Sequence, residues 1–100
     1  MKVDLIYDED CPNWRTVADE LTELLGECDF TLELRESSSL DPTLAARYRG
    51  SPTILVDGRD PFVGEGEPVG AACRIYRTPR GPAGTPTLEQ LRDALGTRGR

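Results

Sequence analysis

The order of hydrophobic patterns in the first 35 residues constrains the fold more than any other feature of the sequence. Lys2–Tyr7 is a short β-prone run, and residues 28–34 alternate apolar with polar side chains, as a strand with one buried face does. Between them, apolar side chains recur at the i, i+3, i+4, i+7 spacing of a helix with one buried stripe, at Trp14, Val17, Ala18, Leu21, Leu24 and Leu25. The sequence therefore predicts a strand–helix–strand unit.

Proline and glycine mark the two ends of this first helix. Pro12 suits the first helical position, where a backbone N–H is not needed, and Gly26 suits a left-handed residue that closes the helix. Cys11 is then expected at the N-cap, directly after the acidic run Asp8–Asp10.

Five further segments are expected after this unit, and they complete one α/β domain over residues 1–96. They are a short helix between Pro42 and Gly50, a buried strand at 53–56, a long loop at 59–72, a fourth strand at 73–78 and a last helix from Thr85–Thr87 to Leu95. Breaker-rich residues 79–84 precede the last helix, and residues 97–100 are expected to fray.

Length, charge and the absence of histidine exclude several classes of protein. No apolar run approaches the roughly 18 residues that span a bilayer, so we expect a cytoplasmic protein without membrane contact. Residues 1–70 carry 16 acidic and 6 basic side chains, whereas residues 71–100 carry 2 and 6. An acidic body repels phosphate backbones, which argues against nucleic-acid binding. Without histidine, the chain has no imidazole base and no Ser-His or Cys-His pair.

Two motifs, together with the order of elements, resemble the thioredoxin-like superfamily. The first runs from Val3–Tyr7 into Cys11-Pro12-Asn13-Trp14 and is similar to the strand, active-site cysteine and first helix of that family. The second, Arg49–Gly58, is similar to the segment in which a cis-proline faces the cysteine. The resemblance implies a β-α-β-α-β-β-α three-layer sandwich with a four-stranded mixed sheet, a nucleophile at Cys11 and a cis-proline at Pro52.

The chain departs from the family at the position of the resolving cysteine, which is Trp14. The motif therefore reads CxxW, and the chain resembles degenerate, small bacterial members that act as monothiols. The resemblance also implies that Pro12, Trp14, Ser51 and Pro52 line a substrate site. Trp14 has a second interpretation as a core residue, because it lies on the apolar stripe of the helix.

Two electrostatic effects on Cys11 oppose each other. A helix N-terminus stabilises a thiolate by about 0.3–1 kcal/mol, and each neighbouring carboxylate of Asp8–Asp10 costs a similar amount in water. The sequence thus leaves open whether Cys11 is reactive or a structural N-cap. The three acids can likewise serve as a general acid or as solvated loop charges.

The other two cysteines differ in their expected roles. Cys28 shares the inward side of its strand with Phe30, which predicts an inert core thiol. Cys73 could resolve an oxidised Cys11, but the fourth strand of the simple fold begins about 15 Å away at the opposite end of the sheet, so only the long loop could join the two. No C-x-x-C spacing exists, and neither a metal site nor a cofactor is expected.

The leading hypothesis is a thiol protein in which Cys11 attacks a disulfide or a soft electrophile. Cys73 or an external thiol would resolve the product, and the expected partners are a small thiol or a protein disulfide, with the oligomeric state open. One alternative is a non-enzymatic binding module that uses the Pro52 groove and the loop at 59–72. Another is capture of a soft metal of the organomercury type by Cys11 and Cys73.

Overall fold

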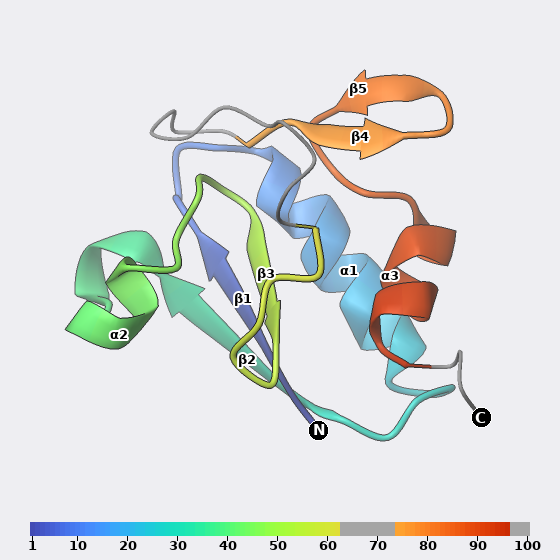
Figure 1. Cartoon of the computed structure of the whole chain (residues 1–100), viewed down its shortest axis with the longest axis horizontal. Coiled ribbons are helices and arrows are strands. Elements are labelled where there is room, and N and C mark those ends of the chain that lie inside the picture. The colour runs from blue at the N-terminus through green and yellow to red at the C-terminus, as the bar shows by residue number, and fades with distance from the viewer. Residues whose placement is uncertain (63–73, 97–100) are drawn as a thin grey trace.

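Strand β1 (Lys2–Tyr7) lies at the centre of a mixed sheet in the computed structural model, which describes residues 1–62 and 74–96 (Figure 1). β2 (Thr31–Glu36) pairs with it in parallel and β3 (Thr53–Val56) pairs antiparallel, in the order β2-β1-β3. Helix α1 (Asn13–Leu24) connects β1 to β2. The predicted strand–helix–strand unit is therefore confirmed.

The remaining elements are shorter and lie around this unit. They are the 3-10 helix η1 (Ser37–Ser39), α2 (Pro42–Ala45), β4 (Tyr76–Thr78), β5 (Gly81–Ala83) and α3 (Leu88–Ala94). In Figure 1, α2 lies to the left of the sheet, and α1 and α3 lie to its right. No helix of the described residues is long and apolar enough to cross a membrane.

The predicted four-stranded sheet is wrong, because β4 pairs with β5 and forms a separate hairpin. Residues 79–84, expected as a loop, supply the partner strand. Gly81 adopts a positive φ of 105°, which favours glycine at this tight reversal. The outer edge of β3 is instead met by Arg59, which bridges back to Val56 after the turn at Asp57 and Gly58. The chain thus covers the β3 edge locally, before it reaches β4.

The main core lies between the sheet and the pair α1 and α3. The sheet contributes Val3, Leu5 and Ile54, which are fully buried, and the helices contribute Val17, Leu21, Leu24, Leu91 and Leu95. Each such side chain stabilises the fold by about 1.5–3 kcal/mol relative to exposure. The apolar stripe of α1 is therefore buried in the core, as its spacing predicts.

The opposite face of the sheet is also buried, on the side of α2. Ile6 and Leu55 alternate with the core residues of their strands and are fully buried. Asp4 shares this face, and its carboxylate accepts a hydrogen bond from Arg35 Nε at 2.8 Å. The ion pair offsets the cost of placing a carboxylate that is 4% exposed against the sheet.

Two local predictions for the first unit are wrong. Leu34, expected to face inward, is 49% exposed, because β2 is an edge strand at the rim of the sheet. Gly26 does not adopt the positive φ that was expected of it. The helix ends instead in overlapping turns, which include the hydrogen bond from Cys28 N to Leu24 O at 2.8 Å. Cys28 and Phe30 are buried as expected, although both precede β2.

Candidate functional site

Cys11 lies at the point where the chain leaves β1 and enters α1. Its backbone N–H donates to Asp8 O at 2.9 Å, and the Asp8 carboxylate accepts from Asp10 N at 2.9 Å, so an Asx-type turn precedes the cysteine. The helix starts one residue later than predicted: Pro12 is the N-cap, at φ −72° and ψ −15°, and no side chain caps it. Cys11 precedes the cap instead of forming it.

The thiol of Cys11 is buried against the turn that precedes β3. Cys11 is 1% exposed, and its Sγ donates to the carbonyl oxygen of Ser51 at 3.5 Å. The antiparallel pairing of Ile6 with Thr53 explains the encounter, because it brings the residues before β3 alongside the end of β1. The Ser51–Pro52 peptide bond is cis, as the resemblance implied.

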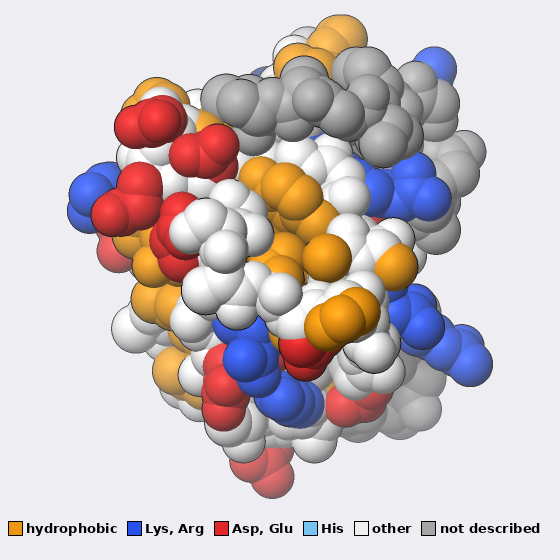
Figure 2. All heavy atoms as spheres, turned by 90° about the vertical axis from the view of Figure 1, so that its left-hand side faces the viewer, with side chains coloured by type: hydrophobic (Ala, Val, Ile, Leu, Met, Phe, Trp, Pro, Cys, Tyr) orange, Lys and Arg blue, Asp and Glu red, His pale blue; other side chains and the backbone are white. Residues whose placement is uncertain are grey.

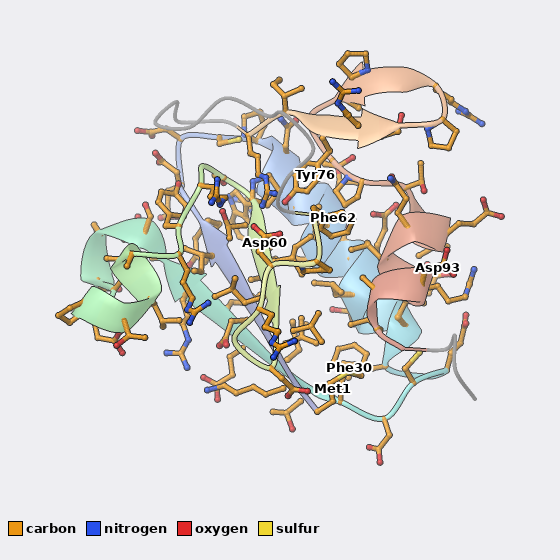
Figure 3. The ribbon with its side chains drawn as sticks, in the orientation of Figure 1. Met1, Phe30, Asp60, Phe62, Tyr76 and Asp93 are labelled. Carbon is orange, nitrogen blue, oxygen red and sulfur yellow. The ribbon has the colours of Figure 1, made fainter. Side chains whose placement is uncertain are left out.

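The segment that begins at Arg74 covers the same turn. Arg74 N donates to Ser51 O at 2.9 Å, and the hydroxyl of Tyr76 donates to Pro52 O. The ring of Phe62 meets Tyr76 edge-on, with centroids 5.2 Å apart, and Figure 3 shows the two rings together. The described chain therefore re-enters at the Cys11 end of the sheet. The expectation that the fourth strand begins at the far end of the sheet is wrong, because β4 does not join the sheet.

A buried ion pair holds this covering segment in place. Arg74 Nη1 lies 2.7 Å from Asp60 Oδ2, and the two side chains are 0% and 8% exposed. The guanidinium also lies over the ring of Tyr76, 4.5 Å from its centroid. Removing one partner from such a pair typically costs about 3–5 kcal/mol, because the other charge is left buried. The sequence did not predict this ion pair, because the two residues lie 14 positions apart in a stretch with no regular hydrophobic spacing.

Trp14 flanks the start of α1 and lies outside the main core cluster. Its ring stacks on Tyr7 with centroids 4.1 Å apart, and the guanidinium of Arg15 lies 4.8 Å from the Trp14 centroid. The interpretation of Trp14 as a core residue, which followed from its position on the apolar stripe, is therefore wrong. Tyr7 was missed, although its alternation with Leu5 along β1 already placed it on the α1 face.

Nε1 of Trp14 and Oγ of Ser51 are buried at this end of the fold and make no hydrogen bond within the described residues. Ser51 is fully buried. Buried polar groups are normally hydrogen-bonded, so each is a potential contact for a ligand or a water. Pro12, by contrast, is exposed beside them at the N-cap.

The hairpin β4–β5 approaches the same helix end at Gly84. A Cβ on this residue would lie 2.2 Å from Asn13 Nδ2, so only glycine permits the contact without a shift of Asn13. The start of α1 is thus enclosed by the β1 loop, the turn at Ser51 and the hairpin.

The remaining sequence candidates fall outside this cluster or outside the described residues. Cys28 is a free, buried thiol beyond the other end of α1, whose 12 residues span about 18 Å. Glu9 and Asp10 are exposed, which favours their interpretation as solvated loop charges. Cys73 and most of the loop at 59–72 lie outside the described residues. Within the described ranges, no group of three or more acidic or cysteine side chains could hold a metal ion.

The chain was compared with protein families, with curated proteins and with solved structures. No family model, no curated protein and no solved structure matches it. The contacts of Cys11 are therefore the strongest indication of function in this chain.

Proposed function

We propose that this chain is a thioredoxin-like thiol protein that uses Cys11 for thiol–disulfide exchange. The observation that carries the proposal is the 3.5 Å contact between Cys11 Sγ and Ser51 O directly before the first helix. A helix N-terminus favours a thiolate, and a backbone carbonyl beside it can align an extended substrate. The order of strands and helices in residues 1–56 supports the likeness to the family.

The proposed exchange has two steps. The Cys11 thiolate attacks one sulfur of a substrate disulfide, forms a mixed disulfide and releases the other substrate sulfur as a thiolate, which takes a proton from solvent. A second thiolate then attacks Cys11 Sγ or the substrate sulfur and breaks the mixed disulfide. Trp14 occupies the position of a resolving cysteine, so the second thiol is Cys73 or an external small thiol. Attack on Cys11 Sγ leaves Cys11 joined to the second thiol in a new disulfide, so two thiols are oxidised and the substrate disulfide is reduced to two thiols. Attack on the substrate sulfur regenerates the Cys11 thiolate, so the second thiol replaces one half of the substrate disulfide and no net oxidation occurs.

A non-enzymatic binding module is the second candidate, and a specific observation favours it. The Ser51 carbonyl already accepts from Arg74 N, and Cys11 is 1% exposed. A substrate would have to displace the segment at Arg74 to reach the thiol. The turn at Pro52 would then be a structural contact, and any ligand would bind through the remaining surface.

The test is the reaction of each cysteine with a small disulfide, followed by peptide mass spectrometry. The native protein is mixed with cystamine at neutral pH, and Cys28 serves as the internal control for a buried thiol. We expect Cys11 to form a mixed disulfide well before Cys28, and Cys73→Ser to slow its resolution if Cys73 is the second thiol. Cys11→Ser should remove the fast reaction.

Equal rates at Cys11 and Cys28, both following unfolding in urea, would overturn the enzymatic proposal and favour the binding module. Capture of a soft metal by Cys11 and Cys73 makes a separate prediction. One equivalent of Hg²⁺ would then protect both thiols from alkylation, whereas monothiol chemistry predicts protection of Cys11 alone.

A further inference from the structure

Three arginines line one pocket at the α2 side of β3. The pocket has a volume of about 380 Å³ and is lined by Ala46, Arg47, Arg49, Leu55, Arg59 and Asp60. Such a volume lies at the lower end of the range of small-ligand sites, about 300–1,000 Å³. The concentration of positive charge is notable because the chain as a whole has a net charge of −6.

Among the described lining residues, Asp60 carries the one carboxylate, and this carboxylate already pairs with another cation. Asp60 Oδ2 lies 2.7 Å from Arg74 Nη1, and Asp60 Oδ1 accepts from Arg74 Nη2 at 3.4 Å. Arg74 itself is not among the lining residues. The charge of Asp60 is therefore largely neutralised by Arg74, and the exposed side chains of Arg47 and Arg59 present positive charge to a ligand.

Two separate segments bring these arginines together. Arg47 follows α2, Arg49 precedes the turn at Ser51, and Arg59 follows the turn after β3 and pairs with Val56 through its backbone. Both Arg47 and Arg59 are exposed, so their guanidinium groups can reach a ligand from solvent. Leu55, fully buried in the sheet, provides an apolar surface between them.

The face on the α2 side carries charges of both signs. Figure 2 shows this face: acidic side chains gather at its upper left, basic side chains lie at its right, and side chains of both signs lie together at its lower centre. An anion that approaches this face is thus repelled by one part and attracted by another. Asp60, labelled in Figure 3, lies beside β3 and is one of the residues that line the pocket.

We propose that this pocket binds the phosphate group of a small molecule. Guanidinium groups bind phosphate oxygens through paired, charge-assisted hydrogen bonds, and a phosphate dianion matches several arginines better than a single carboxylate does. The inference does not rest on the thiol chemistry of Cys11. Free phosphate and a phosphate ester share the required chemistry, and the volume leaves room for the organic part of an ester.

The test is calorimetric titration of the full chain at low ionic strength with inorganic phosphate and with ribose 5-phosphate. We expect one saturable site for at least one of the two probes; tighter binding of the ester would identify an esterified ligand, and tighter binding of the ion would identify free phosphate. Affinity for the ester should rise as the pH rises through about 6, where the second phosphate proton is lost.

The variants Arg47→Gln and Arg59→Gln should each weaken binding by about tenfold, because each removes one charge-assisted contact. Arg80→Gln is the matched control, since Arg80 is an exposed arginine on the β4–β5 hairpin and its replacement changes the net charge equally. Circular dichroism of each variant verifies that it is folded.

Three results would overturn the proposal. One is the absence of saturable binding of both probes to the folded wild-type chain. Another is equal weakening by Arg80→Gln, which would mark a general charge effect. The third is acetate binding as tight as phosphate binding, which would assign the pocket to a carboxylate.

Discussion

At the scale of single residues, the surroundings of Glu20 on α1 disfavour the ionised form of its carboxyl group. Glu20 on α1 has a pKa raised above its ordinary value of 4.5, chiefly by desolvation and also by the charge of Glu23. Its Oε1 is buried and makes no hydrogen bond within the described residues. Ionisation of Glu20 therefore works against folding, in contrast to Glu27, whose pKa is lowered by its hydrogen bond from Arg92.

Replacing Glu20 by glutamine should raise the stability of the protein at pH 7. A carboxyl with a raised pKa in the folded state favours folding while it is protonated, and this contribution is lost as the pH rises through the raised pKa. The gain of Glu20→Gln over wild type should consequently be full at pH 7 and vanish near pH 4. Urea denaturation at several pH values measures it. Asp19→Asn, an exposed site on the same helix, is the control for net charge; an equal gain there would refute the assignment to Glu20.

At the scale of elements, α3 is short and depends on its first turn. Thr87 Oγ1 accepts from Gln90 N at 3.1 Å, and Gln90 Oε1 accepts from Thr87 N at 2.8 Å, which completes a capping box. Gln90 Nε2 also donates to Arg77 O at 2.8 Å and so links α3 to β4. A helix of seven residues is marginal by itself, so this cap and the burial of Leu91 hold it in place.

Thr87→Ala should lower the free energy of unfolding by about 1 kcal/mol, because it removes the N-cap acceptor of α3. Thr22→Ala is a matched control with the opposite expected sign. Thr22 is exposed near the end of α1, and its hydroxyl donates back to Ala18 O at 2.8 Å, an arrangement that does not favour helix formation. Urea denaturation of both variants measures the difference, and equal effects would show that the cap contributes nothing.

At the scale of the whole molecule, the Cys11 site is assembled from segments far apart in the sequence. The loop after β1 supplies the thiol, the turn before β3 supplies the carbonyl of Ser51, and the chain before β4 supplies the amide of Arg74. The thiol is consequently enclosed by contacts that must open before it reacts. Reactivity of Cys11 and the local stability of the Arg74–Tyr76 segment are therefore coupled.

Tyr76→Phe tests this coupling, because it removes the hydroxyl that donates to Pro52 O and leaves the ring in place. Loss of one hydrogen bond of about 1 kcal/mol should make local opening easier and speed the reaction of Cys11 with cystamine by about fivefold. The reaction rate of Cys28 in the same sample reports global unfolding. A rise at both cysteines, or at neither, would contradict a local opening at Arg74–Tyr76.

The sequence by itself determined the local elements whose patterns are strong. The apolar stripe from Val17 to Leu24 gave α1 one buried face, and the β-prone runs gave the central strand and its neighbours. Gly96 directly follows the C-cap of α3 and adopts a positive φ, as predicted, whereas α2 ends at Ala45, before Gly50. These features are decided within a few residues, by side-chain periodicity and backbone freedom, so a single sequence suffices to find them.

Tertiary structure alone decided the pairing of β4 and the surroundings of Cys11. A three-residue strand has too little pattern to choose its partner, and the nearby turn at residues 79–80 favours β5 over the more distant β3. The Arg74–Asp60 pair, the stacking of Trp14 on Tyr7 and the arginine pocket likewise join positions that no local period relates. Such contacts depend on how the packed elements meet, because burial and charge pairing act through space and leave no regular spacing in the chain.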